Sequence, residues 1–157
     1  MPQLSCHSPV GDITIHEWDG AIVSLDWGWG SLQEPSPLLK EAKCQLEAYF
    51  DGDLKTFDLP LAPGGTSFFT RLWRRLMDIP YGEVVTYGRL AAELGSHARA
   101  VGMACARNPI PILIPCHRVV ARDGRLAGYS GDGGLETKAF LLRLEGAGEA
   151  EDLRLPL

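Results

Sequence analysis

The alternation of hydrophobic and polar positions near the start of the chain predicts a β-hairpin. Residues 11–27 read GDITIHEWDGAIVSLDW, and hydrophobic residues recur at every second position on both sides of Asp19-Gly20. A period of two is typical of a half-buried strand, and Asp-Gly favours a tight two-residue turn. We therefore expect two antiparallel strands joined at Asp19-Gly20.

The spacing of the hydrophobic positions then changes to three and four residues, which predicts a helix over SPLLKEAKCQLEAYFDG. Ser36 can cap its N-terminus, Pro37 suits its first turn and Gly52 can end it. TFDLPL, residues 56–61, follows as a predicted short strand. Residues 1–62 thus predict a small α/β domain, and the segment APGG is its linker to the rest of the chain.

Three short helices are expected in the middle of the chain. The first begins after Thr66 and buries Phe69, Leu72, Trp73 and Leu76. The second runs over residues 87–94 and stops at Gly95, and the third lies in ARAVGMACARN. Two short helices around a glycine-containing turn are typical of a helix-turn-helix, although an ordinary helical hairpin gives the same pattern.

The last part of the predicted domain, residues 66–148, combines extended segments and one helix. IPCHRVVARDGRLAGYS predicts two extended pieces around Asp123-Gly124, and GLETKAFLLRLEG predicts a helix that ends at Gly146. Residues 149–157 are a polar tail that we expect to be frayed.

Charge is unevenly distributed along the chain. The balance is −7 over residues 1–70, +5 over residues 71–125 and −3 over the remainder. The basic segment contains nine Arg and no Lys, and the planar guanidinium suits phosphates and base edges. Together with the predicted helix-turn-helix, this favours a DNA-binding use, while a solvated surface with chance clustering is the alternative.

Composition places the chain among ordinary globular proteins, with 157 residues, 45% hydrophobic and 22% charged. We expect no secretory signal, and no hydrophobic run approaches the roughly 20 residues that cross a bilayer. None of the four cysteines forms a C-x-x-C pair. A protein of the reducing cytoplasm is therefore expected.

Candidate chemistry is concentrated in NPIPILIPCHRVV, which places Cys116 beside His117 in an otherwise hydrophobic segment. A thiol needs a base to become a nucleophilic thiolate, and a histidine supplies one when a carboxylate orients it. A buried, inert cysteine beside a satisfied histidine is the alternative. We expect no zinc site, because adjacent residues rarely chelate one ion.

The wider pattern around this pair resembles the O6-alkylguanine-DNA alkyltransferases, which are direct-reversal DNA repair proteins. The resemblance rests on PCHRVV and on FTRLW, IPYGEVVTYGRLA, ARAVGMACARNPIPILIPCHRVV, GYSG and KAFLLRLEG, in family order. YFDGDLKTFDLPL resembles the N-terminal domain more weakly. The family has an α/β N-terminal domain with a ribonuclease-H-like sheet and a C-terminal winged helix-turn-helix domain, and we expect both here.

The resemblance implies a role for each matching residue of the catalytic site. Cys116 would take the alkyl group irreversibly, once per protein, after His117 removes its proton through a water and Glu145 supports His117. Tyr87 would donate a proton to N3 of the leaving guanine. Asn108 would hydrogen-bond backbone next to the cysteine loop and join the two halves of the site.

The resemblance also implies that the protein flips the damaged base out of double-stranded DNA, with Arg99 filling the gap from a helix in the minor groove. The other expected DNA-binding residues are Ala98, Ala100, Gly102, Arg89, Arg107, Arg118 and Thr86. The alkylguanine pocket would include Val119, Tyr129, Ser130, Gly131, Lys138 and Pro111, with Ser130 offering its backbone N–H to O6.

The expected substrate is O6-alkylguanine in duplex DNA and, less certainly, O4-alkylthymine. No cofactor, no metal and no membrane partner are expected, and the protein is expected to be a cytoplasmic monomer. A non-catalytic sensor of alkylated DNA is the main alternative, although such proteins carry another residue in place of the cysteine. A helix-turn-helix regulator would leave Cys116, His117 and Glu145 idle, and a thiol hydrolase would not use the arginines.

Overall fold

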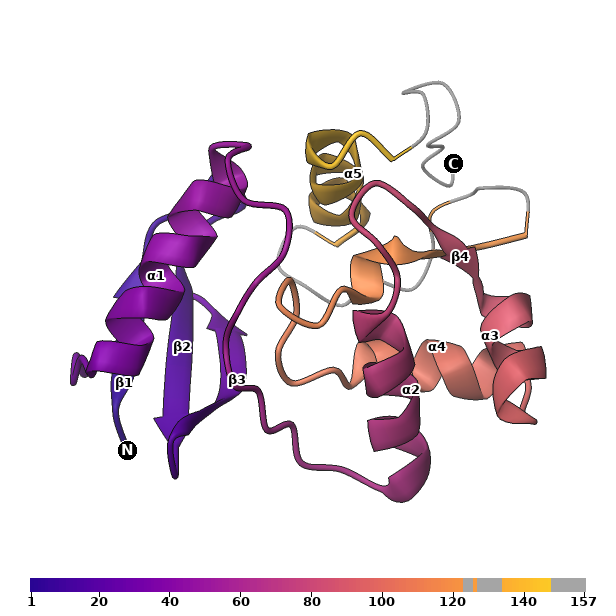
Figure 1. Ribbon diagram of the computed structural model, residues 1–157, viewed down its shortest axis with the longest axis horizontal. Coiled ribbons are helices and arrows are strands. Elements are labelled where there is room, and N and C mark those ends of the chain that lie inside the picture. Colours follow the sequence, from indigo (N-terminus) through magenta and orange to yellow (C-terminus); the bar gives the residue numbers. More distant parts are fainter. Residues whose placement is uncertain (123–125, 127–133, 148–157) are drawn as a thin grey trace. The chain divides into compact units, whose positions relative to one another are not determined.

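The computed structural model describes residues 1–122, Leu126 and residues 134–147. The chain divides into two compact units, Met1–Gly64 and the part from Gly65 onward. Its elements are β1 (Gln3–Cys6), β2 (Ile13–Trp18), β3 (Ala21–Trp27), α1 (Pro37–Phe50), α2 (Ser67–Met77), β4 (Val85–Thr86), α3 (Tyr87–Leu94), α4 (Ala98–Ala106), the 3-10 turn η1 (Cys116–Arg118), β5 (Val119–Val120) and α5 (Leu135–Leu144) (Figure 1). No helix in these described ranges is long and apolar enough to cross a membrane.

The first unit is a three-stranded antiparallel sheet in the order β1-β2-β3. Strands β2 and β3 form the predicted hairpin, in which Trp18 lies opposite Ala21. Asp19 and Gly20 between them have φ of 51° and 79°. Positive φ at both central residues is what a two-residue type I′ turn requires, so the Asp-Gly signal predicted this turn correctly.

Helix α1 packs against strands β1 and β2 of this sheet. Ile13 and Ile15 of β2 are fully buried, as are Leu39 and Tyr49 of the helix. The Ser36 hydroxyl accepts a hydrogen bond from the backbone N–H of Leu39 at 3.1 Å, which confirms the predicted N-cap. The hydrophobic stripe of the helix therefore forms the core of this unit together with one face of the sheet.

One expectation for the first unit is wrong, and one strand was missed. Residues 56–61 do not form a strand, because only an isolated bridge joins Leu61 to Ile22. Pro60 lies inside this segment and has no N–H with which to extend a ladder. Strand β1 was not predicted, and its short, weakly alternating sequence QLSC explains the omission.

The second unit contains the predicted helix-turn-helix, formed by α3 and α4, with α2 packed against α4. Side chains cap each of the three helices, since Thr66, Thr86 and His97 accept hydrogen bonds from the N–H of Phe69, Arg89 and Ala100. Gly95 ends α3 with φ 67°, a left-handed cap that glycine adopts without strain.

Trp73 fastens α2 to α4. Its indole Nε1–H donates to the backbone oxygen of Ala104 at 3.0 Å, and its side chain is buried beside Leu72 and Leu76. Phe69, which was also expected on the buried face, is only half-buried. The buried face of α2 is therefore narrower than the sequence pattern predicts.

A short parallel pairing connects two distant parts of the second unit. Val85 pairs with Val119 and Thr86 with Val120. Because β4 leads directly into α3 and β5 follows η1, this pairing brings Tyr87 close to the turn that begins at Cys116. Of the extended piece expected before Asp123-Gly124, Val119–Val120 form β5, whereas Cys116–Arg118 form η1. The turn itself, the piece after it except Leu126, and the tail 149–157 lie outside the described residues.

Gly65 provides a test of the packing around Trp73. A Cβ at Gly65 would lie 2.8 Å from the Trp73 ring, which cannot retreat because its indole N–H is bonded to Ala104. We expect Gly65→Ala to lower the free energy of unfolding by about 1–3 kcal/mol. Gly64→Ala is the matched control, because nothing lies within 4 Å of its Cβ. Urea denaturation followed by circular dichroism measures both, and equal stabilities for the two variants would refute the packing argument.

Candidate active site around Cys116

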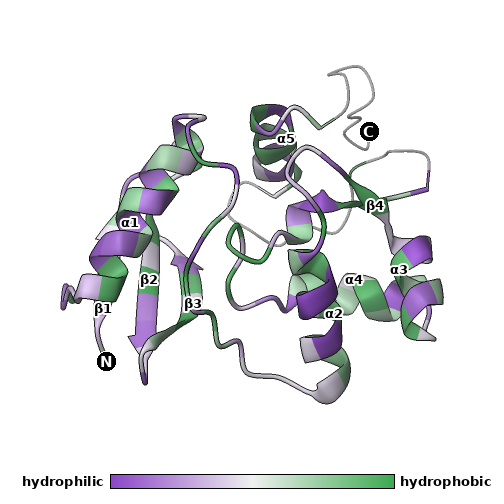
Figure 2. Ribbon diagram, in the orientation of Figure 1, coloured by the Kyte–Doolittle hydropathy of each residue, from purple (hydrophilic) through white to green (hydrophobic). Residues whose placement is uncertain are grey.

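The loop that leads from α4 to Cys116 is hydrophobic and almost entirely buried (Figure 2). Ile112 in this loop has φ 74°, in the left-handed region. That conformation costs a residue with a side chain about 1–2 kcal/mol, and the cost is higher for a β-branched one. The surrounding contacts must therefore hold the loop in place.

Asn108 supplies two of these contacts. Its Oδ1 accepts from the N–H of Ile110 at 2.9 Å, and its Nδ2 donates to the oxygen of Ile114 at 2.9 Å. The same Ile114 oxygen accepts from the N–H of Cys116 at 2.8 Å. Asn108 thus clamps both ends of the loop that positions the thiol, which is the contact expected of it.

Cys116 is the first residue of η1 and is 5% exposed. Burial raises the pKa of its thiol above the ordinary value, and a hydrogen bond with Asn108 and the charge of Lys138 only partly oppose this. The group is therefore a neutral thiol at rest. It requires a base before it can act as a nucleophile.

His117 and Glu145 form a buried pair beside this thiol. Nε2 of His117 lies 2.8 Å from Oε2 of Glu145, and both side chains are fully buried. Burial alone would raise the pKa of Glu145, but the hydrogen bonds that it accepts from His117 and Arg118, together with the charge of Arg118, outweigh burial and lower the pKa to about 2. The carboxylate is thus ionised and acts as the acceptor, so Nε2 of His117 carries the proton.

The second ring nitrogen of His117 is consequently the basic one. Nδ1 has no hydrogen-bond partner among the residues that the structure describes. Burial lowers the pKa of the imidazole, with Arg118 and Lys138 acting in the same direction and Glu145 opposing them. His117 is therefore a neutral imidazole with a free acceptor, which is the form a general base requires.

The expected DNA contact of Arg118 does not fit its position. The residue is 8% exposed. Its Nε donates to Oε1 of Glu145 at 2.9 Å, its Nη2 to Oε2 at 3.0 Å and its Nη1 to the oxygen of Ile79 at 2.7 Å. Because its guanidinium is committed to these buried acceptors, we remove Arg118 from the DNA-binding set.

Tyr87 and Lys138 lie together near the thiol. Nζ of Lys138 donates to the Tyr87 hydroxyl at 3.2 Å and lies 5.4 Å from the centre of its ring. Burial, with contributions from Cys105 and Cys116, raises the pKa of Tyr87, so this phenol keeps its proton. Lys138 is fully buried, and burial lowers its pKa to about 8.

Cys105 of α4 is a further buried thiol near this group, and it was not among the expected site residues. Its charge state influences the pKa of Tyr87 and of Lys138, which shows that the three side chains are close. Its position four residues after buried Val101 is the helical spacing that could have identified it as inward-facing.

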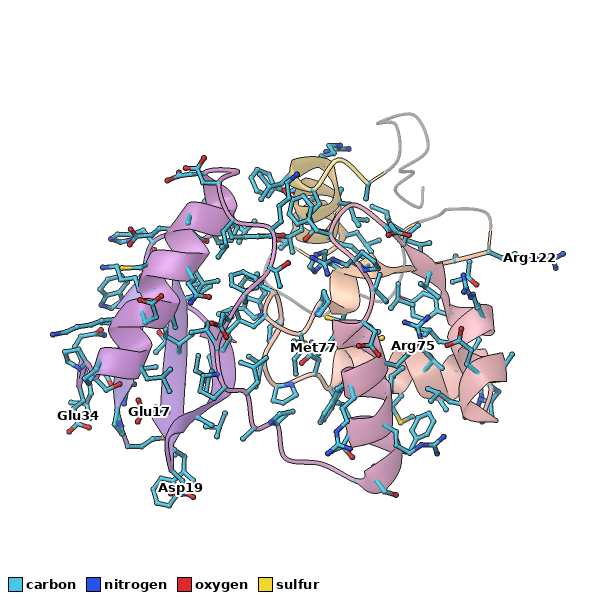
Figure 3. The ribbon with its side chains drawn as sticks, in the orientation of Figure 1. Glu17, Asp19, Glu34, Arg75, Met77 and Arg122 are labelled. Carbon is cyan, nitrogen blue, oxygen red and sulfur yellow. The ribbon has the colours of Figure 1, made fainter. Side chains whose placement is uncertain are left out.

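The expected DNA-binding residues other than Arg118 lie on α3, α4 and their ends. Arg99, Ala98 and Arg107 are exposed, while Ala100 and Gly102 are half-buried. Arg89 is exposed but shares Glu93 with Arg75, and the hydroxyl of half-buried Thr86 caps α3. Arg122 after β5 is another exposed arginine, whose side chain points outward (Figure 3).

The expected pocket residues are only partly described. All three described members, Pro111, Val119 and Lys138, are buried. Pro111 and Val119 are near Cys116 in the sequence, and Lys138 is near enough in space for its charge to lower the pKa of the thiol. Tyr129, Ser130 and Gly131 lie outside the described residues. Within the described ranges, no group of three His, Cys, Asp or Glu side chains converges as a metal site would require.

Comparison with known proteins shows two family matches. Residues 5–63 match the ribonuclease-like domain of 6-O-methylguanine DNA methyltransferases, and residues 67–147 match their DNA-binding domain. This confirms the fold class expected from the sequence. The chain is 42% identical over 154 residues to the constitutive methylated-DNA–protein-cysteine methyltransferase of Bacillus subtilis, covering 90% of this chain and 93% of that protein.

Further relatives and solved structures agree. A methylated-DNA–protein-cysteine methyltransferase of Methanosarcina barkeri is 45% identical over 148 residues, 88% of this chain and 92% of that protein. The O6-methylguanine methyltransferase of Mycobacterium tuberculosis superposes with a TM-score of 0.82 at 38% identity, over 95% of each chain. The structure of M. tuberculosis OGT in complex with DNA gives a TM-score of 0.83 at 37% identity, over 97% of each chain.

The buried pair of His117 and Glu145 predicts a specific dependence of stability on pH. The folded pKa of Glu145, about 2, lies below its ordinary value of 4.5. The ionised carboxylate therefore stabilises the fold above pH 4.5, and this stabilisation is lost as the pH falls from 4.5 toward 2. We expect Glu145→Gln to be less stable than the parent at pH 7 by about 3 kcal/mol, with a gap that closes over this range.

Urea denaturation at a series of pH values measures the gap. Glu93→Gln is the matched control, because its carboxylate also pairs with arginine but at the surface, where such pairs contribute little. A gap for Glu145→Gln that is constant with pH would contradict the assignment of an ionised carboxylate.

Proposed function

This chain belongs to the family of 6-O-methylguanine DNA methyltransferases, and from that premise we propose how its own residues perform the reaction. The protein is a direct-reversal DNA repair enzyme that transfers a methyl group from methylated DNA to a cysteine of its own. The alternative of a non-catalytic lesion sensor is not supported. The observation that carries our assignment is Cys116 beside a neutral His117 with a free Nδ1 and with Nε2 bound to Glu145.

The first step activates the thiol of Cys116. Because burial raises the pKa of this thiol, its proton must leave as the nucleophile attacks. Nδ1 of His117 accepts that proton through one water molecule, and Glu145 stabilises the imidazolium that forms. Sulfur then forms a bond to the alkyl carbon while the bond from that carbon to O6 of guanine breaks.

The departing guanine takes the electron pair of the broken bond and needs a proton. Tyr87, which burial keeps protonated at rest, donates it to N3. The Lys138 ammonium, 3.2 Å from the Tyr87 oxygen, stabilises the phenolate that remains. The product is a thioether on Cys116, which has no easy leaving group. Among the described residues we assign no second nucleophile that would remove the alkyl group, so the protein reacts once.

We assign DNA binding and alkyl transfer to residues 66–148 and regard residues 1–62 as the separate α/β domain. O6-alkylguanine flips out of the duplex into a site that includes Val119 and Pro111, and Arg99 takes the place of the lost base. Ala98, Ala100 and Gly102 are small and permit close approach of α4 to the minor groove. O4-alkylthymine is a second substrate, and the protein acts as a cytoplasmic monomer.

Methyl transfer is tested with a duplex oligonucleotide that contains one O6-methylguanine and is present in excess. We expect one methyl group on the Cys116 peptide by mass spectrometry, an equal amount of repaired guanine and no further turnover. Cys116→Ser should remove all transfer, whereas Cys44→Ser, at an exposed cysteine, should not change it. Binding of the duplex without modification of Cys116 would contradict the proposal.

Base flipping is tested separately through Arg99. We expect Arg99→Ala to slow methyl transfer from the duplex by about tenfold or more, because the flipped state then lacks the group that fills the stack. Transfer from free O6-methylguanine base should be unchanged, because no base has to leave a stack. Arg71→Ala, at an exposed arginine of α2, is the control. An equal loss on both substrates would show that Arg99 supports the site itself.

A further inference from the structure

Arg118 is a buried cation that the proposed reaction does not yet use. It binds both carboxylate oxygens of Glu145 and the backbone oxygen of Ile79, at distances of 2.7–3.0 Å. Oε2 of Glu145 therefore accepts from Arg118 and from His117 at the same time. Two parallel N–H donors of one guanidinium fix the orientation of the carboxylate plane and also stabilise its negative charge.

The segment from Ile79 to Gly82 completes the surroundings of Glu145. The Tyr81 ring centre lies 6.0 Å from the guanidinium carbon of Arg118, and the Tyr81 hydroxyl donates to the oxygen of Leu144 at 3.1 Å. A Cβ at Gly82 would lie 3.2 Å from the backbone oxygen of Glu145, so this segment passes close to it. Arg118 and the segment that contains Ile79, Tyr81 and Gly82 thus form the surroundings of Glu145.

We propose that Arg118 is a positioning residue for alkyl transfer, which orients the Glu145 carboxylate so that His117 presents Nδ1 as the acceptor of the thiol proton. This inference rests on the proposed function. Arg118 acts through Glu145 and His117 and does not contact the reacting atoms or the DNA.

Charge explains why the carboxylate needs this partner. With Arg118 in place, the buried arginine and glutamate neutralise each other, and His117 remains uncharged. Without Arg118, a lone buried carboxylate would stabilise its neighbour as an imidazolium, because an ion pair costs less than an isolated buried charge. An imidazolium cannot accept the thiol proton, so the base would be lost at neutral pH.

The charged groups around His117 determine the direction in which its pKa moves when Arg118 is removed. Arg118 from η1 and Lys138 from α5 both lower the pKa of His117, whereas Glu145 raises it. Cys116 and Tyr81 are neutral in this range, because burial raises the pKa of each. Removing Arg118 while Glu145 remains therefore moves the pKa of His117 upward.

The test measures single-turnover methyl transfer from duplex O6-methylguanine as a function of pH. We expect Arg118→Met to slow transfer at pH 7 by about 10- to 100-fold and to move the acidic limb of the pH profile upward by about one unit. Arg118→Lys keeps the positive charge but loses the paired guanidinium donors. Its transfer rate and pH profile should therefore lie between those of the parent and those of Arg118→Met. Arg75→Met is the matched control, because Arg75 (labelled in Figure 3) forms an ion pair with the partly exposed Glu93.

A double-mutant cycle separates positioning from a general effect on the fold. If Arg118 acts only through Glu145, then adding Arg118→Met to the Glu145→Gln variant should slow methyl transfer by less than about twofold. The same loss in both backgrounds would overturn the proposal. A pH profile of Arg118→Met that coincides with the parent's would also overturn it.

Nitrogen NMR of His117 in the protein without DNA makes the inference testable apart from the repair activity. The parent should show a neutral ring protonated at Nε2 at pH 7, and Arg118→Met should show the imidazolium up to a higher pH. If Arg118→Met does not fold, Arg118→Lys takes its place, with a smaller shift in the same direction. Absence of methyl transfer in the parent would refute the proposed function alone, whereas an unchanged His117 titration would refute the role of Arg118.

Discussion

The arrangement around Cys116 depends on one buried carboxylate. Glu145 lies immediately after α5, while its partners His117 and Arg118 belong to η1. A buried carboxylate is tolerated only when its oxygens accept hydrogen bonds. Three donors, His117 Nε2 and Arg118 Nε and Nη2, bind the Glu145 oxygens at 2.8–3.0 Å. The same bonds therefore join α5 to η1 and fix which nitrogen of His117 is basic. Structural stability and the protonation state of the base arise from one interaction.

The loop before Cys116 shows a second constraint of the same kind. Its hydrophobic residues bury it, and Asn108 closes it at both ends, so it can hold Ile112 in a left-handed conformation that a free chain would avoid. Strain of this kind persists only where the surroundings over-determine the backbone. The hydrophobic character of the segment thus explains how a thiol beside an imidazole can occupy a fixed position inside a core.

Sequence patterns predicted the elements that depend on local chemistry. The Asp19-Gly20 hairpin, the caps at Ser36 and Thr66 and the stop at Gly95 all follow from neighbouring residues. Predictions failed where distant contacts decide. Arg118 reads as a surface cation in a basic segment, and its buried role depends on Glu145, 27 positions later. Helical spacing marks Cys105 as inward-facing, and Lys138 was expected in the alkylguanine pocket, but their shared surroundings beside Tyr87 depend on contacts between distant segments.

The electrostatics of the site suit a reaction that moves negative charge from sulfur to guanine. Arg118 and Glu145 cancel, and His117, Cys116 and Tyr87 are neutral at rest. Lys138, whose pKa burial lowers to about 8, is still largely a cation at neutral pH and lies within hydrogen-bonding distance of Tyr87. Its charge lowers the pKa of Cys116 and therefore favours the thiolate. Burial strengthens the electrostatic effect of the Lys138 charge, because little water screens it. The same burial raises the pKa of the thiol, so in the proposed reaction the thiolate forms only as His117 accepts its proton.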